Sequence, residues 1–333
     1  MYPVCRGKSI DRILRSWFRK HLMFCDKIKR YQCWTCIVKF YLANKAPGKA
    51  PWINFLCSLL LFSVVVCGCK KAKPDYEQRN SYYKNIASTP AFDSALTVVT
   101  YNIQCGFEAG KDPWNKAHEG GTAEYIGRLA AVIEQSGADV VMLQEVPHNR
   151  SNTDIKEFLA ALGEATDMNY SFGAHGYNDA YGVEPVRGQW GNAILSKYEI
   201  SEIENIEVAR TDVWRRRSVL RSRLKLGEGK FIDCYSLHHL SYAERQQENT
   251  VAFVKSSSLP KVVGGDFNTA PNSFAGYSGL AVIQKDSIKG IDHILISDQF
   301  TAINYGIVPL SRLSEATIAP SDHEAVFAQI QLH

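Results

Sequence analysis

The stretch DVVMLQEV, residues 139–146, has an apolar run at 140–143 followed by a glutamine and a glutamate. A short continuous apolar run of this kind predicts a strand buried on both faces, as in the sheets of α/β proteins. Ligand sites in such sheets form at the carboxyl ends of strands. Glu145, close to that end, is therefore the first candidate for a site residue.

Other predicted strands also end in polar side chains. Asn102 closes LTVVTYN at residues 96–102, and Asp266 follows KVVGG at residues 261–265. Strand ends from distant parts of a chain can meet in one crevice, so these side chains are expected to form a single site. Carboxylates, amides and imidazoles in one place indicate metal-assisted hydrolysis. The full set is Asn102, Glu145, His239, Asp266, Asn268, Asp292, Asp322 and His323.

Strands outnumber helices after residue 94. Helical spacing predicts helices over residues 123–135, 153–165 and 243–255, and about ten segments have strand character. Short turns such as Gly227-Glu228-Gly229 link several neighbouring strands, so the sheets must contain antiparallel pairs. About ten strands exceed a comfortable single open sheet. The pattern predicts an α/β domain of two mixed sheets packed face to face, with flanking helices.

Charge divides the chain into two unlike parts. Residues 1–73 contain 15 of the 38 lysines and arginines but two of the 34 acidic residues, so residues 74–333 carry 23 − 32 = −9 formal charges. An acidic body lacks the broad basic surface of an avid nucleic-acid binder. An enzyme that binds nucleic acid weakly and briefly stays compatible with this charge.

The apolar stretch INFLCSLLLFSVVVCGC, residues 53–69, has lysines on both sides. It is short for a membrane-spanning helix and suits the apolar core of a signal peptide. Its end resembles a bacterial lipobox, in which Cys69, preceded by Gly68, is the residue expected to be lipidated. An uncleaved membrane anchor is the alternative. Both interpretations predict a membrane-tethered protein outside the cytoplasm, in the periplasm or at the cell surface.

These patterns set the expected domain boundaries. Residues 1–69 form a basic extension with the signal or membrane segment, residues 70–93 form a polar tether, and residues 94–333 form the domain that carries the site. Two of the nine cysteines, Cys105 and Cys234, lie in that domain. They are expected to be buried free thiols rather than a disulfide.

Seven motifs occur in order along this domain: TYNIQCG, LQEV, GNAILS, HHL, GGDFN, IDHI and SDH. Together they resemble the endonuclease/exonuclease/phosphatase superfamily, and the resemblance covers essentially all of residues 96–333. It implies a four-layer α/β sandwich that hydrolyses phosphoesters with Mg²⁺ or Mn²⁺, here as a bacterial lipoprotein member.

The resemblance also implies roles for the candidate residues. Glu145 is implied as the principal metal ligand, with Asn102 and Asp322 beside it, and Mg²⁺ prefers oxygen ligands of this kind. Asp266 and Asn268 are two residues apart and face one side of an extended segment. This spacing suits a carboxylate that aligns or deprotonates the attacking water, with an amide that steadies phosphate oxygens.

Two histidines are expected to contact the scissile phosphate as donors to its developing charge. One is His323. The other is His239 rather than His238, because neighbouring strand residues face opposite ways and the family pattern puts the active histidine directly before Leu240. Asp292 is the expected carboxylate partner of one of these histidines, and the pairing is left open.

Substrate-contacting residues are less well defined. Tyr177, Tyr181 and Arg187 are candidates within residues 173–190, where the superfamily motifs do not align. Pro147 stands two residues after Glu145, where some nucleases of the superfamily have arginine. The arginines at positions 215, 216, 217, 221 and 223 fit either a surface for a polyanion or anionic lipid, or a solvated sheet edge.

The sequence thus predicts a monomeric, membrane-tethered, extracytoplasmic, Mg²⁺-dependent phosphodiesterase or phosphatase that uses in-line attack by water. Expected substrates are phospholipid headgroups or small phosphoesters such as sugar or inositol phosphates. A nuclease acting on DNA or RNA is the alternative within the same chemistry. A non-catalytic surface lipoprotein that only binds a ligand is the alternative from another class.

Overall fold

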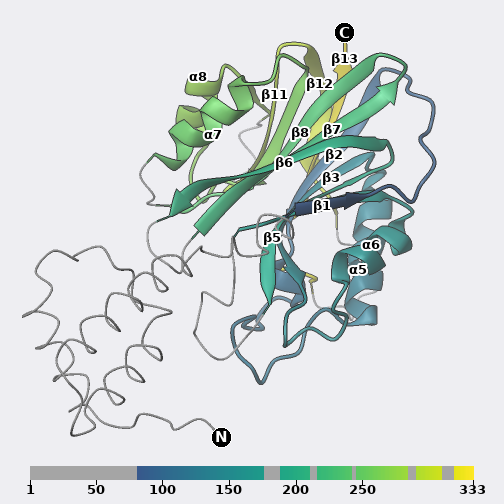
Figure 1. Ribbon diagram of the computed structural model, residues 1–333, viewed down its shortest axis with the longest axis vertical. Coiled ribbons are helices and arrows are strands. Elements are labelled where there is room, and N and C mark those ends of the chain that lie inside the picture. Colours follow the sequence, from purple (N-terminus) through teal and green to yellow (C-terminus); the bar gives the residue numbers. More distant parts are fainter. Residues whose placement is uncertain (1–80, 176–187, 211–215, 242–244, 284–289, 310–318) are drawn as a thin grey trace, which may run out of the picture. The chain divides into compact units, whose positions relative to one another are not determined.

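The computed structural model describes residues 81–175, 188–210, 216–241, 245–283, 290–309 and 319–333 (Figure 1). The predictions for residues 1–69, including lipidation of Cys69, lie outside this part of the chain, as do Tyr177, Tyr181 and Arg187. In the described residues, no helix is both long and apolar enough to cross a membrane.

The described strands form two mixed sheets, as predicted. The seven-stranded sheet consists of β1 (Ser81–Lys84), β2 (Ala95–Asn102), β3 (Val140–His148), β4 (Asn169–Ala174), β5 (Gln189–Ser196), β12 (Phe300–Ile307) and β13 (Val326–Leu332). The six-stranded sheet consists of β6 (Glu199–Arg210), β7 (Arg216–Gly227), β8 (Lys230–His238), β9 (Lys261–Asp266), β10 (Ala281–Ile283) and β11 (Asp292–Ile296). Their orders are β1-β4-β5-β3-β2-β13-β12 and β10-β11-β9-β8-β7-β6.

Three apolar cores separate four layers, which confirms the predicted sandwich. Met142 and Leu220 belong to the core between the two sheets. Leu129 belongs to the core under the helices of the seven-stranded sheet, and Val254 and Phe274 to the core under those of the six-stranded sheet. The two helix pairs lie on opposite outer faces of the sandwich (Figure 1). They are α5 (Ala123–Ser136) with α6 (Phe158–Thr166), and α7 (Gln246–Lys255) with α8 (Asn272–Ser278).

Helix α5 matches its prediction and α6 begins later than expected. The Thr122 side chain accepts the N–H of Tyr125 at the start of α5, and Gly137 ends the helix with a φ of 65°. Helix α6 begins at Phe158 rather than Thr153. The Thr153 hydroxyl instead donates to the Arg150 carbonyl, and Thr153 pairs with Gly120 in an isolated bridge. The Thr153 hydroxyl therefore stabilises a loop rather than the start of the helix.

The predicted polar tether at 70–93 is too long at its carboxyl end. Its residues 81–84 form the edge strand β1, which pairs antiparallel with β4. The Tyr82 ring lies 5.6 Å from Phe172 and 5.5 Å from His148, measured between ring centroids. These contacts on the sheet explain why a mostly polar segment is ordered here.

The two parallel strand pairs position the site. Strands β2 and β3 run parallel in one sheet, and β8 and β9 run parallel in the other. In register, Asn102 lies beside Gln144, and His238 lies beside Asp266. The carboxyl ends of all four strands therefore bring polar side chains from distant parts of the chain together.

Two smaller predictions are also confirmed. Cys105 and Cys234 are buried free thiols, and burial raises the pKa of each thiol. Strands β7 and β8 are joined by the predicted turn, in which Gly229 has a φ of 67° that suits glycine.

A pair of glycine substitutions tests the packing of the seven-stranded sheet. A Cβ at Gly191 in β5 would lie 2.1 Å from the carbonyl oxygen of Gly173 and 2.7 Å from the Cα of Ala174. Because backbone atoms cannot move aside cheaply, we expect Gly191→Ala to lower the unfolding free energy by about 2 kcal/mol or more. Urea denaturation measures this change.

Gly127 in α5 supplies the matched control. A Cβ there meets nothing within 4 Å, and the position is exposed. Gly127→Ala is expected to raise the unfolding free energy by about 0.5–1 kcal/mol, since alanine favours the helix. Equal effects of the two substitutions would contradict the strand packing described above.

Candidate active site

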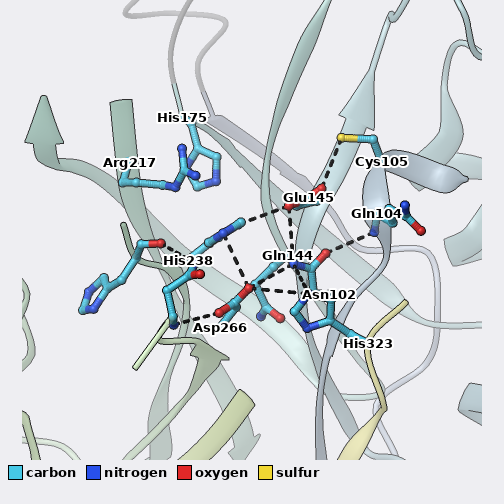
Figure 2. A network of polar contacts seen from close by, with 12 residues as sticks. Asn102, Gln104, Cys105, Gln144, Glu145, His175, Arg217, His238, Asp266 and His323 are labelled. Atoms are coloured by element: carbon cyan, nitrogen blue, oxygen red, sulfur yellow. Dashed lines mark hydrogen bonds and ion pairs between the residues drawn. The ribbon is translucent and has the colours of Figure 1, made fainter. Parts of the chain in front are cut away.

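Asn102 lies at the centre of a cluster of polar side chains that joins the two sheets (Figure 2). Its Nδ2 donates to Asp266 Oδ2 at 3.2 Å and to Glu145 Oε1 at 3.4 Å, and it lies 3.5 Å from His323 Nε2. Its Oδ1 accepts the backbone N–H of Gln104. Four residues that the sequence singled out, Asn102, Glu145, Asp266 and His323, thus meet in one place.

Glu145 reaches this cluster through a backbone irregularity. Strict alternation along β3 would turn its side chain toward the helices, on the side of Leu143. The register with β5 shifts between Leu143 and Val146, and Glu145 has a φ of 54°. A bulge with a left-handed residue re-aims the carboxylate, and such strain in a non-glycine residue is typical of functional positions. Burial raises the pKa of Glu145, although the Asn102 hydrogen bond opposes it.

Asp266 is the most buried carboxylate of the cluster, with 2% of its side chain exposed. Its Oδ1 accepts the backbone N–H of Asn268 at 2.8 Å. Burial, with the charge of Asp292 as a second cause, raises the pKa of Asp266 to about 6. A carboxylate held near neutrality is well suited to take a proton.

Asn268 is arranged differently from the prediction. Its Nδ2 donates to the backbone carbonyl of His239 at 2.8 Å, so in this structure the amide joins the ends of β8 and β9. Its φ of 52° is in the left-handed region, which asparagine tolerates better than most residues. A role in steadying phosphate oxygens stays a prediction.

The structure resolves the pairing of Asp292. His323 Nδ1 donates to Asp292 Oδ2 at 2.7 Å, which leaves His323 Nε2 facing Asp266 Oδ2 at 3.8 Å. Burial lowers the pKa of His323, but the hydrogen bond and charge of Asp292, with the charges of Asp266 and Asp322, outweigh it and raise the pKa to about 9. His323 is therefore a cation near neutral pH, with Nε2–H free to donate toward the centre of the cluster.

The prediction that His239 rather than His238 points into the site is wrong. His238 points into the cluster, with Nε2 3.5 Å from Asp266 Oδ2 and Nδ1 3.8 Å from Glu145 Oε1 (Figure 2). His239 faces the helix layer instead, where its Nε2 lies 3.0 Å from the Thr250 hydroxyl and its ring lies 5.6 Å from Phe267. The two histidines do face opposite ways, as predicted. The register of β8 with β9 places His238 beside Asp266, on the side that faces the cluster.

Burial lowers the pKa of both histidines, and Arg217 adds to the effect. For His238 the pKa falls well below its usual value, and for His239 it falls to about 3. His239 also lines a cavity of about 680 Å³ next to the cluster, together with Leu240, Phe267 and Thr269. This cavity lies beside the cluster and does not include its carboxylates.

Asp322 is exposed, unlike the other carboxylates of the cluster. Its Oδ1 lies 3.4 Å from the Ser321 hydroxyl, which donates to the Asn102 carbonyl oxygen at 2.7 Å. The charge of Asp322 contributes to the raised pKa values of Glu145 and His323. It therefore lies at the rim of the cluster, close enough to act on it.

The oxygen donors fit a divalent cation better than a protein cation. Glu145 Oε2 lies 3.7 Å from the Cys105 thiol, and the carboxylate has no lysine or arginine partner within 4.0 Å among the described residues. Asp292 Oδ1 is buried and has no hydrogen-bond partner there. The Glu145 carboxylate, and the free oxygen of Asp292 whose other oxygen is bonded to His323, could therefore serve as ligands of a divalent cation.

Two groupings of donors could hold such an ion. Asp266, Asp292 and His323 each offer a donor atom, all within 4.8 Å of one another. In that grouping, however, His323 Nδ1 is already bonded to Asp292. The predicted grouping of Glu145 with Asn102 and Asp322 does not use the histidine, which is then left for the phosphate.

Three residues near the cluster were not singled out as site residues: His175, Trp190 and Cys105. His175 follows β4 directly and so has the same strand-end signal as the chosen residues. Its ring lies 5.9 Å from His238 and 4.8 Å from Trp190. Trp190 and Cys105 carry no comparable signal, because a buried tryptophan or thiol is usually structural.

Known proteins resemble this chain in sequence and in fold. An uncharacterized protein of Escherichia coli K12, YbhP, is 30% identical over 193 residues, which cover 52% of this chain and 67% of YbhP. The catalytic domain of human Nocturnin, solved with bound sulfate, superposes with a TM-score of 0.53 at 16% identity, covering 78% of this chain and all of that one.

Two solved proteins of Bacteroides thetaiotaomicron share the fold. An endonuclease/exonuclease/phosphatase family protein superposes with a TM-score of 0.52 at 19% identity, covering 72% of this chain and 98% of that one. A mannosyl-6-phosphatase superposes with a TM-score of 0.50 at 19% identity, covering 71% of this chain and 99% of that one. Residues 99–323 of this chain match the Endonuclease/Exonuclease/phosphatase family, and since that match spans most of the chain, the protein belongs to this family of phosphoester hydrolases.

Proposed function

We propose that the protein is a divalent-metal-dependent phosphoester hydrolase, tethered to a membrane outside the cytoplasm, that uses in-line attack by water. The observation that carries this proposal is the cluster around Asn102, where Glu145, Asp266 and the Asp292–His323 pair converge. It combines a metal-type carboxylate, a carboxylate with a pKa of about 6 and a protonated imidazole. Metal-assisted hydrolysis of a phosphoester uses these three functions.

Glu145 and Asn102, with Asp322 at the rim, would hold Mg²⁺ or Mn²⁺. When bound, the cation offsets negative charge on the phosphate and on the leaving oxygen. The strained backbone at Glu145 directs its carboxylate to that position.

Asp266 is the group we assign to the attacking water. It is fixed by the backbone N–H of Asn268 and by Asn102, so its orientation is set before substrate binds. With a pKa of about 6 it is ionised at neutral pH and accepts a proton more readily than an ordinary aspartate.

His323 and His238 are the imidazoles that we assign to the phosphate. Asp292 fixes the His323 ring, so that its Nε2–H can donate to a phosphate oxygen as charge develops. His238 Nε2 approaches the same oxygen of Asp266 as His323 Nε2, and a neutral imidazole there can donate or accept one hydrogen bond. This arrangement gives His238 the role that the sequence assigned to His239.

A small or lipid-linked phosphoester is the substrate class we favour. The acidic body, with −9 formal charges from 23 bases and 32 acids in residues 74–333, disfavours tight binding of nucleic acid. The apolar segment at 53–69 supports a position at a membrane, where headgroups and small phosphoesters are accessible. A mannosyl-6-phosphatase has the same fold, which supports a sugar phosphate as one of the candidate substrates.

Nuclease activity is the second candidate within the same chemistry. The fold is shared with ANGEL2, a 2′,3′-cyclic phosphatase, so nucleotide phosphoesters also fit this architecture. A panel of sphingomyelin, inositol phosphates, mannose 6-phosphate, RNA and DNA, assayed with Mg²⁺, separates the two. A ligand-binding lipoprotein, by contrast, would hydrolyse none of them.

Removing one group at a time tests the reaction. Glu145→Ala, Asp266→Ala and His323→Ala should each lower kcat on an activated phosphodiester by about 100-fold or more while circular dichroism stays unchanged. Chelation by EDTA should abolish turnover, and added Mg²⁺ or Mn²⁺ should restore it. Full activity in all three variants would refute the proposed function.

The adjacent histidines form a matched pair for the corrected assignment. His238→Ala should lower kcat about 100-fold or more, because it removes a group within reach of Asp266. His239→Ala removes a ring that packs beside Phe267 and Thr250, so it should cost stability but keep kcat within about tenfold. Steady-state kinetics with thermal melts measure both. The reverse ranking of kcat would restore the assignment to His239.

The raised pKa of Asp266 predicts how stability depends on pH without metal. Its folded-state pKa of about 6 exceeds the ordinary 3.8, so ionisation costs more in the folded protein and stability is lost as pH rises from 4 to 7. Asp266→Asn cannot ionise. Relative to wild type in EDTA, it should therefore gain on the order of 2–3 kcal/mol of stability between pH 4 and pH 7.

Urea denaturation at several pH values measures that difference. Only the change of the unfolding free energy with pH is compared, so any pH-independent effect of the asparagine substitution cancels. Asp298, exposed on the surface, gives the control substitution Asp298→Asn. Parallel pH curves for wild type and Asp266→Asn would contradict the buried, costly carboxylate.

A further inference from the structure

A strained turn follows β2 directly after Asn102. It is the short turn η1 (Gln104–Gly106), in which the φ angles of Gln104, Cys105 and Gly106 are 48°, 53° and 81°. Glycine adopts this left-handed region freely, whereas glutamine and cysteine do so at a cost in free energy. Two such residues in succession indicate that the turn has a function, because strain of this kind gathers at functional positions.

Cys105 is the residue that this turn brings to the cluster. Its Sγ lies 3.7 Å from Glu145 Oε2, and Figure 2 shows the thiol pointing to the carboxylate. An ionised carboxylate can only accept a hydrogen bond, so the thiol is the donor. Cys105 is fully buried and packs in a small apolar cluster with Phe107 and Trp190. Water therefore does not compete with the carboxylate for this weak donor.

The same segment of chain also contacts the other oxygen of Glu145. Asn102 Nδ2 donates to Glu145 Oε1 at 3.4 Å, and Asn102 Oδ1 accepts the backbone N–H of Gln104 at 3.1 Å. Asn102 and Cys105 thus contact both oxygens of one carboxylate. Two such contacts restrict the rotation of the carboxylate, while the Glu145 side chain stays 20% exposed to an incoming cation.

Cys234 shows the structural alternative for a thiol in this protein. It is also a buried free cysteine, but it belongs to the apolar core between the two sheets, which also contains Leu220 and Val262. Buried thiols usually act as small apolar side chains of this kind. Cys105 differs because its sulfur contacts a charged group. The two cysteines therefore provide a matched comparison.

We propose that Cys105 is a positioning residue, whose S–H holds Glu145 Oε2 in the orientation that binds the divalent cation while Asn102 holds Oε1. This inference rests on the proposed function, in which Glu145 is a metal ligand. Cys105 acts through Glu145 and is not itself assigned to the metal or to the substrate. Partners that orient a metal ligand contribute to metal affinity, so the effect of Cys105 is expected there first.

Binding of Mn²⁺ without substrate tests this role. Electron paramagnetic resonance of the free ion gives the Kd of the full-length protein. Cys105→Ala removes the donor and should raise the Mn²⁺ Kd about tenfold, the low end for such partners because a thiol donates weakly. Cys105→Ser keeps a donor on a shorter bond, so its Kd should lie between those of wild type and Cys105→Ala. Urea denaturation in EDTA measures the structural cost of each substitution separately.

Cys234→Ala and Cys234→Ser are the controls. Both should keep the Mn²⁺ Kd within about twofold of wild type, because Cys234 contacts no candidate metal ligand. Cys234→Ser should be the less stable of the two, since its hydroxyl would have no partner in an apolar core. Serine is thus expected to be better than alanine for metal binding at position 105, and worse than alanine for stability at position 234.

An unchanged Mn²⁺ Kd in Cys105→Ala would overturn the positioning role, as would a Kd in Cys105→Ser that is no lower than in Cys105→Ala. Glu145→Ala separates this result from failure of the proposed function. If Glu145→Ala weakens Mn²⁺ binding and Cys105→Ala does not, the role of Cys105 alone is refuted. If neither substitution changes the Kd, Glu145 is not a metal ligand and the proposed metal site is refuted with it.

Discussion

The hydrogen bond from Asn102 to Asp266 joins the two sheets at the place where the chemistry lies. Asn102 ends β2 in one sheet and Asp266 ends β9 in the other, so a single amide holds together carboxylates that repel each other. Each sheet contributes one parallel pair, and both pairs end at this point. The site therefore depends on how the sheets pack, and any shift between them would separate Asp266 from Glu145.

The cluster is destabilising without a cation, because burial raises the pKa of both Glu145 and Asp266. Burial of like charges costs folding free energy. Burial of apolar side chains in the three cores offsets this cost. The backbone strain follows the same pattern: Glu145 and Asn268, both with positive φ, lie at or beside the carboxylates. The protein is less stable because of these buried carboxylates, but their positions are fixed before a substrate binds.

Much of the site could be predicted because a polar residue at the end of an apolar strand is visible in the local sequence. Three features could not be predicted, since each depends on the register between distant strands. Parallel pairing of β8 with β9 sets His238 beside Asp266, and antiparallel pairing of β11 with β9 sets Asp292 there. The bulge that re-aims Glu145 shows only in the pairing of β3 with β5. The edge strand β1 was missed because its order depends on distant aromatic contacts rather than on its own polar sequence.

Net charge alone was a poor guide to what the protein binds, since the acidic body also contains a strand rich in arginine. The contacts of each arginine depend on the strands that lie next to it. Glu202 and Glu204 on β6 and Asp233 on β8 face Arg221 and Arg223, whereas the ring of Trp190 from the opposite sheet faces Arg217. A guanidinium between carboxylates is neutralised, so Arg221 and Arg223 stabilise the sheet. The charge of Arg217 adds to burial in lowering the pKa of His238 in the cluster.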